Sequence, residues 1–345
     1  MRRISHPISI GEVTIGGGAP VVVQSMTKTD TRDVQATIAQ VRELEALGCR
    51  IVRLAVPDAE AAQALRHIKA AAKIPLVADI HFDYRLALAA LKAGVDGLRI
   101  NPGNIGELDR VRQIVQEAKA SQVPIRIGIN AGSLPKDVAG ETVAQRMVAA
   151  TLREIEFLES LDFDLIKVSL KAFDVPTTVE ANRLVAQAMP YAIHLGITEA
   201  GPPGSGIVRS AIGIGILLYE GIGDTIRVSL TSHPKEEVTA GYEIMKSLNL
   251  EQRGPVLISC PTCGRCEVGL VELASQVEAQ LKAWDKPIKV AVMGCVVNGP
   301  GEAREADVGI AGGKGRGSIF VKGKVVRTVE EKDFLSALMA EIEKL

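Results

Sequence analysis

The feature that most constrains the fold is a regular alternation of short β-branched segments with longer segments of helical periodicity. Eight segments rich in Val and Ile have the length of strands, namely Val21–Met26, Ile51–Val56, Leu76–Ile80, Gly97–Ile100, Ile125–Ile129, Leu165–Leu170, Ala192–Ile197 and Thr225–Leu230. The intervening segments predict helices, namely Val34–Leu47, Ala59–Ala72, Tyr84–Ala93, Ile105–Ala120, Val143–Leu158, Thr178–Ala188, Val208–Glu220 and Lys235–Leu248. Strands that alternate with helices pair in parallel, so we expect an α/β fold, a (β/α)8 TIM barrel. An open doubly wound sheet is the alternative, disfavoured because no Gly-x-Gly-x-x-Gly follows the first strand.

A second domain is indicated where this alternation stops. Residues 249–255 form a polar breaker that ends in Gly-Pro, and a strand at Val256–Ser259 leads into a cysteine-rich loop. A helix near Val271–Lys282, a strand at Ile288–Met293 and a closing helix at Glu331–Leu345 complete an α+β module. We therefore expect a barrel domain at 1–248 and a smaller α+β domain that carries the cysteines at 249–345. The Gly-rich loop at 312–317 lacks the spacing of a phosphate-binding loop and predicts a hairpin turn.

The cysteines of this second domain have the spacing of metal ligands. Cys260, Cys263 and Cys266 are each separated by two residues, and Cys295 follows later with Glu302 beyond it. Thiolates at this spacing can hold one metal centre from a single turn, with the distant Cys closing the site. A disulfide framework suits short secreted chains better than this one. A zinc ribbon usually has two paired Cys-x-x-Cys halves, so an iron–sulfur cluster is favoured over zinc.

The overall charge gives no reason to expect a nucleic-acid or membrane partner. The formal net charge is −1 and the sequence pI is about 6.6. No apolar run reaches the roughly 20 residues of a spanning helix, and the N-terminus lacks the apolar core of a signal peptide. We therefore expect a cytoplasmic protein, where reducing conditions suit a labile cluster.

Cations gather at the predicted C-terminal ends of the barrel strands, where the active sites of such barrels lie. Five strands carry them at or near that end: Arg53, Arg99, Arg126, Lys167 with Lys171, and Arg227. Alternate residues of a strand share a face, so Asn130 accompanies Arg126 and Ser229 accompanies Arg227. A single strand-end arginine is most often structural, but five converging strands indicate an anionic, polyphosphate-like substrate.

Acidic groups are few at this rim. Asp79 ends the third strand and is either a proton-transfer group or a helix cap or salt-bridge residue. Glu199 follows the seventh strand and is a candidate for moving a proton. The segment Gly204-Ser-Gly206 opens the seventh helix, where backbone amides can hold a phosphate.

Seven motifs together resemble one enzyme family almost from end to end. They are Val23-Gln-Ser-Met26, Ala78-Asp-Ile-His-Phe-Asp-Tyr-Arg85, Arg99-Ile-Asn-Pro-Gly-Asn104, Gly196-Ile-Thr-Glu-Ala-Gly201, Glu220-Gly-Ile-Gly-Asp-Thr225, Cys260-Pro-Thr-Cys263 and Gly294-Cys-Val-Val-Asn-Gly-Pro-Gly-Glu302. They resemble the bacterial two-domain 4-hydroxy-3-methylbut-2-enyl diphosphate synthases of the methylerythritol phosphate route to isoprenoids. The resemblance implies an oxidoreductase that opens the ring of 2-C-methyl-D-erythritol 2,4-cyclodiphosphate and removes a hydroxyl group, using two electrons.

The resemblance also implies the roles of individual residues. A [4Fe–4S] cluster would be held by Cys260, Cys263, Cys295 and Glu302, and the weakly held corner at Glu302 would take part in catalysis. Glu199 would handle a proton, and the substrate would be bound by Arg53, Arg99, Arg126, Asn130, Lys171, Arg227 and Ser229. Cys266 departs from the family pattern and stays open as an alternative fourth ligand. Reduced ferredoxin or flavodoxin is the expected electron donor.

The connection between the domains predicts a head-to-tail homodimer. The last barrel helix runs away from the mouth, and residues 249–255 reach at most roughly 23–25 Å when extended. We therefore expect each cluster domain to cap the partner's barrel. Two other interpretations remain: a pterin-binding barrel of the dihydropteroate-synthase kind fused to a metal module, and an iron–sulfur carrier without enzymatic activity.

Overall fold

The chain folds into two compact units, which are described separately. The computed structural model describes residues 2–101, 105–106, 108–295 and 305–345. The first unit is Met1–Leu250 and the second is Glu251–Leu345. Glu302 lies outside the described residues.

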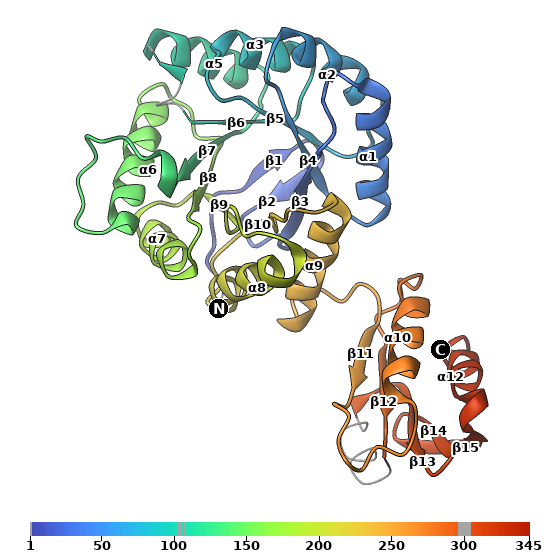
Figure 1. Ribbon diagram of the computed structural model, residues 1–345. Coiled ribbons are helices and arrows are strands. Elements are labelled where there is room, and N and C mark those ends of the chain that lie inside the picture. The colour runs from blue at the N-terminus through green and yellow to red at the C-terminus, as the bar shows by residue number, and fades with distance from the viewer. Residues whose placement is uncertain (1, 102–104, 107, 296–304) are drawn as a thin grey trace. The chain divides into compact units, whose positions relative to one another are not determined.

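The first unit is a closed barrel of parallel strands, which confirms the predicted TIM barrel (Figure 1). Strand β10 closes it by pairing with both β3 and β9. The strands are β3 (Val22–Met26), β4 (Ile51–Ala55), β5 (Leu76–Asp79), β6 (Gly97–Ile100), β7 (Ile125–Asn130), β8 (Ile166–Lys171), β9 (Ala192–Leu195) and β10 (Thr225–Ile226). Strand β10 is shorter than predicted, because the backbone of Leu230 bonds to a side chain of the following helix.

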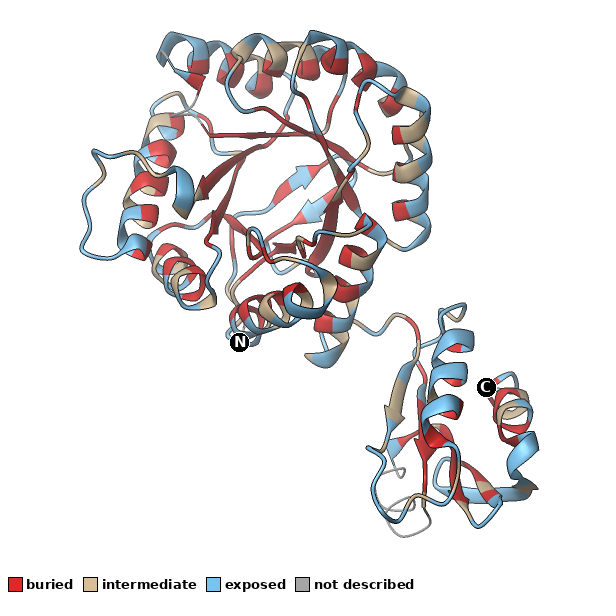
Figure 2. Cartoon of the chain, in the orientation of Figure 1, coloured by how far each residue is buried: buried red, intermediate tan, exposed pale blue. Residues whose placement is uncertain are grey.

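Helices cover the outside of the barrel with their apolar faces turned inward (Figure 2). They are α1 (Val34–Ala46), α2 (Ala59–Ala71), α3 (Tyr84–Lys92), α5 (Leu108–Ala120), α6 (Val143–Glu159), α7 (Val175–Ala188), α8 (Pro203–Tyr219) and α9 (Pro234–Ser247). Asp33, Asp58, Asp83 and Asp174 each cap a helix by accepting from a backbone N–H of its first turn. Helix α8 begins five residues before the predicted Val208, because Pro203 fits the first helical position.

A hairpin that the sequence analysis did not predict closes the N-terminal end of the barrel. Strands β1 (Ile8–Ile10) and β2 (Val13–Ile15) are antiparallel, and Gly11 supplies the positive φ of the turn. The buried side of this hairpin packs on the first inward-facing residues of the barrel strands. These residues are Val22, Ile51, Val77 and Ala192. The hairpin therefore supplies the apolar layer on which the polar interior of the barrel rests.

The second unit is a mixed sheet with two helices. The sheet order is β11 (Val256–Ser259), β12 (Lys289–Met293), β13 (Val308–Gly313), β14 (Arg316–Val321) and β15 (Lys324–Glu330). Strands β11, β12 and β13 are parallel, whereas β14 and β15 are antiparallel to their neighbours. Helices α10 (Leu270–Leu281) and α12 (Phe334–Ile342) bury their apolar residues against the sheet.

The Gly-rich loop of this unit is a hairpin turn between β13 and β14, as predicted. Its Lys314 backbone N–H donates to Glu267 Oε2 at 3.0 Å, which fixes the turn to the cysteine loop. Within the described part of the chain, no helix combines the length and apolar character needed to cross a membrane.

Candidate active site

The barrel interior is lined by cations at different depths. Lys171 ends β8, whereas Lys167 is the second residue of that strand and lines a buried space with Ile10 of the hairpin, so it lies deeper than the sequence analysis placed it. Register places Arg99 beside Arg126, and Arg126 beside Lys167, across β6, β7 and β8. Lys171 lies further along β8, and all four of these side chains are buried. Arg53 of β4 is also largely buried, with 12% of its side chain exposed. The structure therefore brings together cations that stand far apart in the sequence.

Two glycines on inward-facing positions make room for these long side chains. A Cβ atom at Gly128 would lie 2.6 Å from Arg99 Nε, and one at Gly196 would lie 2.6 Å from Lys171 Nζ. Any larger residue at either position would displace the neighbouring cation. The glycine on β7 and the glycine that follows β9 are thus part of the cation site.

Asp79 is the counter-charge of one group of cations. Its carboxylate lies 3.1 Å from Arg99 Nη1, 3.5 Å from Arg53 Nε and 3.7 Å from His81 Nε2. Burial alone would raise the pKa of Asp79, but Arg53, His81, Arg99 and Arg126 outweigh it and hold that pKa well below its usual range. Asp79 is therefore an ionised salt-bridge residue, which is the structural alternative considered for it from the sequence.

A second group of buried cations has little counter-charge. Within the described residues, Lys167 Nζ and Arg126 Nε and Nη1 make no hydrogen bond. Burial, followed by the charge of Arg126, lowers the pKa of both Lys167 and Lys171 well below the usual lysine value. An arginine keeps its proton in proteins, whereas a lysine can lose it. Without an anionic ligand, Lys167 and Lys171 are therefore the residues that lose a proton, which lowers the positive charge of the site.

The lowered pKa of Lys167 and Lys171 predicts that both the stability of the ligand-free protein and its affinity for an anion depend on pH. Between the lowered pKa of Lys167 and Lys171 and the usual lysine value, the unfolded chain binds more protons than the folded one. The free energy of unfolding of the ligand-free protein should therefore rise with pH across that window. An anion restores the charged form, so its binding should take up protons and weaken as pH rises.

Proton uptake can be measured by calorimetry of ligand binding in buffers that differ in ionisation enthalpy. Lys167→Met should reduce the uptake, whereas Lys136→Met, on the loop before α6, should leave it unchanged. Binding without any proton uptake would contradict this prediction.

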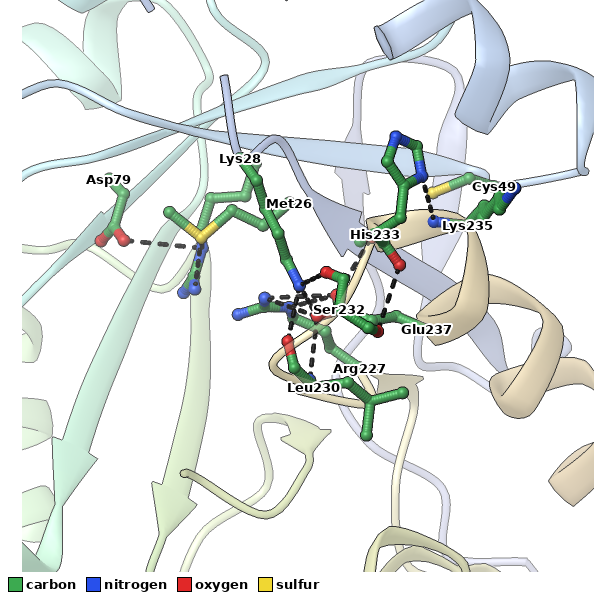
Figure 3. Close-up of polar contacts among 12 residues, drawn as sticks. Met26, Lys28, Cys49, Asp79, Arg227, Leu230, Ser232, His233, Lys235 and Glu237 are labelled. Atoms are coloured by element: carbon green, nitrogen blue, oxygen red, sulfur yellow. Dashed lines mark hydrogen bonds and ion pairs between the residues drawn. The ribbon is translucent and has the colours of Figure 1, made fainter. Parts of the chain in front are cut away.

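Arg227 belongs to a separate ion-pair cluster around Glu237, which the sequence analysis missed (Figure 3). Arg227 Nη2 lies 3.2 Å from Glu237 Oε2, and Lys28 Nζ lies 2.9 Å from Glu237 Oε1. The available signal was the position of Glu237 on α9, on the same buried face as Val238 and Gly241. A carboxylate at a core position of an amphipathic helix indicates a buried charged partner.

The remaining candidates lie on loops and strand ends. Glu199 follows β9, is exposed, and has a backbone φ of 53°, which is uncommon for a residue other than Gly. Asn130 ends β7 and Ser229 follows β10, and both are half-buried. Gly204-Ser-Gly206 lies in the first turn of α8, which has no side-chain cap; the Gly206 N–H donates to the Pro202 carbonyl, so the amides of Gly204 and Ser205 are the candidates for binding an anion.

In the second unit, two neighbouring parallel strands bring the cysteine motifs together. Cys260 follows β11, and Cys295 follows β12. The backbone N–H of Gly294 donates to Cys260 Sγ at 3.3 Å, so a hydrogen-bond donor already faces this sulfur. Cys263 is exposed in the same loop. Among the described residues, no three His, Cys, Asp or Glu side chains are grouped as a metal site.

Cys266 has contacts within the second unit that need no metal, and Cys260 packs against the same core. The Cys266 Sγ donates to the carbonyl oxygen of Val268 at 3.3 Å, and Cys266 packs against the core of the second unit. A Cβ atom at Gly294 would lie 2.6 Å from this sulfur, so the two loops are in close contact here. These contacts give Cys266 a packing role that needs no metal.

The fold and the two residue sets define a class: a TIM-barrel protein with a cationic mouth and a second domain that carries cysteines. Comparison with known proteins identifies the family. The model of the GcpE TIM-barrel domain matches residues 5–242, and that of the GcpE protein C-terminal domain matches residues 256–344. The chain belongs to the GcpE family.

Curated bacterial relatives cover both domains. A protein of Dehalococcoides mccartyi is 64% identical over 100% of this chain and 99% of its own length. A protein of Geobacter sulfurreducens is 56% identical over 100% of this chain and 99% of its own length. Both are named 4-hydroxy-3-methylbut-2-en-1-yl diphosphate synthase (flavodoxin). The predictions of an enzyme and of its oxidoreductase class are thereby confirmed.

Two solved structures are similar to this chain over about 70% of its length. Dihydropteroate synthase of Yersinia pestis has a TM-score of 0.53 and 9% identity, and covers 70% of this chain and 98% of its own. The enzyme of Coxiella burnetii has a TM-score of 0.51 and 13% identity, and covers 72% of this chain and 100% of its own. At such low identity the likeness shows the fold, and it gives no support to a pterin substrate.

Proposed function

We propose that this protein converts 2-C-methyl-D-erythritol 2,4-cyclodiphosphate to 4-hydroxy-3-methylbut-2-enyl diphosphate by reductive ring opening and dehydroxylation. The observation that carries the proposal is the group of buried cations with little counter-charge in the barrel interior. A cyclic diphosphate supplies two negative charges in a compact volume, which matches this excess. The names of the close relatives support the same product.

Substrate binding is assigned to the barrel. Arg53 and Arg99 are oriented by Asp79, Arg126 carries charge that the ligand would neutralise, and Lys171 would take up a proton when the anion binds. Guanidinium groups bind phosphate oxygens through paired N–H groups, whereas lysine acts as a point charge. Arg227, Asn130 and Ser229 complete the proposed set at the C-terminal ends of β7 and β10.

The cysteine donor set fits a [4Fe–4S] cluster. Cys260, Cys263 and Cys295 would be three of its ligands, and the Gly294 N–H beside Cys260 Sγ suits a metal-bound thiolate. Glu302, outside the described residues, is the proposed fourth. When bound, the cluster would supply electrons and an iron with Lewis-acid character. The exchangeable oxygen ligand would leave this iron accessible, which a fourth thiolate would resist.

Glu199 is proposed to move the proton that the reaction requires. Ring opening breaks the bond between the tertiary carbon and its phosphoester oxygen, which stays with the diphosphate, and the neighbouring secondary hydroxyl group leaves as water. Two electrons and one proton balance the step, and a double bond forms between the two carbons. The exposed carboxyl group of Glu199 stands on the loop after β9, on the side where barrel enzymes bind their substrates. Its role is general acid–base catalysis at a departing oxygen.

Two partners are proposed. The names of the relatives include flavodoxin, which we propose as the electron donor. A head-to-tail homodimer is supported by the short connection at residues 249–255, which reaches at most roughly 23–25 Å. Mixing Glu199→Ala with Cys295→Ala subunits tests the dimer, because verified heterodimers that stay inactive would rule out a site shared between chains.

The function is tested with anaerobically reconstituted protein, reduced flavodoxin and the cyclic diphosphate. We expect turnover of this substrate and no binding of a pterin. Arg126→Ala should weaken affinity for the cyclic diphosphate roughly 10- to 150-fold, since a hydrogen bond to a charged group contributes about 1.5–3 kcal/mol. The cluster absorbance should stay unchanged in this variant. Unchanged affinity in Arg126→Ala would remove the barrel mouth as the binding site.

A further inference from the structure

Glu237 is a buried carboxylate at a position where a helix normally carries an apolar residue. It lies on the face of α9 that packs on the barrel, together with Pro234, Val238 and Gly241. Only 1% of Glu237 is exposed. A buried charge is tolerated only when it is paired and hydrogen-bonded, so its partners indicate what it is for.

The partners of Glu237 come from strand β3 and from the loops that follow β3 and β10. Arg227 donates to it through Nε at 3.3 Å and through Nη2 at 3.2 Å, just beyond β10. The backbone N–H of Leu230 donates at 3.0 Å, and Ser25 of β3 donates at 3.3 Å. Figure 3 shows Lys28, Arg227 and Leu230 converging on Glu237.

Lys28 ties the same two loops together. Its Nζ bonds to the carbonyl oxygens of Leu230, at 2.6 Å, and of Ser232, as well as to the Glu237 carboxylate. The three donors of this ammonium group therefore have protein acceptors. Lys28 thus holds the loop after β10 against the loop after β3.

We propose that Glu237 is a positioning residue for substrate binding, which acts by fixing the direction of Arg227. The inference rests on the proposed function. A free arginine side chain loses rotamer freedom when it binds a phosphate, and a guanidinium held in advance by a carboxylate loses less. In the described structure Glu237 engages Nε and Nη2, so the Nη1 hydrogens of Arg227 remain for a ligand oxygen. Lys28 offsets part of the carboxylate's charge, so Arg227 keeps its attraction for an anion.

The barrel contains a matched control for this proposal. Asp79 is also a buried carboxylate near the mouth, but among the described residues it forms ion pairs with Arg53 and Arg99 and none with Arg227. Replacing Asp79 disturbs a different pair of cations. A loss of affinity that depends on Arg227 can therefore be distinguished from one caused by general disorder in the barrel.

The test is a double-mutant cycle on affinity for the cyclic diphosphate, measured on the oxidised holoenzyme without turnover. Glu237→Gln should weaken binding roughly 10-fold or more in the wild-type background. In the Arg227→Ala background the same change should have almost no further effect, because the group it positions is gone. Asp79→Asn should weaken binding by a similar factor in both backgrounds. Cluster absorbance and thermal unfolding verify that each variant is folded.

Each outcome decides one question. Equal weakening by Glu237→Gln in both backgrounds, or native affinity in that variant, overturns the positioning role and leaves the proposed function standing. Native affinity in Arg227→Ala overturns the role of Arg227 as well, and turnover of the cyclic diphosphate by the wild-type protein then decides separately whether the proposed function stands. Should Glu237→Gln fold poorly, Glu237→Asp keeps the charge and enters the same cycle, with partial recovery of affinity as the expected result.

Discussion

Cys295→Ser is expected to lose both its cluster and its turnover, whereas Cys266→Ser keeps both. Cys295 follows β12 beside Cys260, at the edge where the two cysteine motifs meet. Cys266 instead donates to the Val268 carbonyl, a hydrogen bond that a serine hydroxyl can also make. Iron and sulfide content, together with Mössbauer spectra with and without the cyclic diphosphate, measure the difference.

Cys49→Ala is the control for the loss of a thiol as such. Cys49 is buried in the barrel, and burial raises its pKa to about 12, so it stays protonated and cannot act as a ligand. This variant should retain its cluster. An empty cluster site in Cys266→Ser, combined with an unchanged Mössbauer spectrum in Glu302→Gln, would show that Cys266 is the fourth ligand.

Glu199→Gln is expected to bind the cyclic diphosphate almost normally and to turn over about 10²- to 10⁴-fold more slowly, as is typical when a general acid–base group is removed. The amide keeps the size of the side chain and removes the proton that it can exchange. Steady-state kinetics with a chemical reductant measure kcat and KM separately.

The matched control is Glu12→Gln, an exposed carboxylate at the turn of the β1–β2 hairpin, at the opposite end of the barrel. It should leave both kcat and KM unchanged. If Glu199→Gln raises KM and leaves kcat intact, Glu199 is a binding residue and the proton comes from another group.

The sequence predicts the barrel well because each strand is buried on both faces, which selects continuous β-branched segments. The β6 prediction, Gly97–Ile100, agrees with the structure at both ends. The β1–β2 hairpin was missed although Ile8, Ile10, Val13 and Ile15 alternate with polar residues around Gly11. Strands of three residues are too short for a periodicity to stand out. Strand β15 was missed because it is mostly exposed, so burial does not select its residues.

In the candidate site, the positions of cations along the predicted strands show which of them converge, but they do not show which carboxylate each cation pairs with. Arg99 and Arg126 stand at comparable points of successive strands, so their convergence follows from the barrel itself. The pairing of Glu237 with Lys28 joins residues more than 200 positions apart, and no local pattern encodes it. For the same reason, the sequence does not show which cations pair with Asp79 and which have little counter-charge.

Because the β1–β2 hairpin covers the N-terminal end of the barrel, the interior of the described barrel is open only at the C-terminal ends of the strands. Because Ile10 and its neighbours occupy the N-terminal end, the polar side chains above them are closed off on that side in the described structure. Substrate, water and product would then exchange through the mouth alone. Whatever covers the mouth during catalysis would therefore impose an order of events: the diphosphate has to arrive before closure, and release of the product has to wait for reopening.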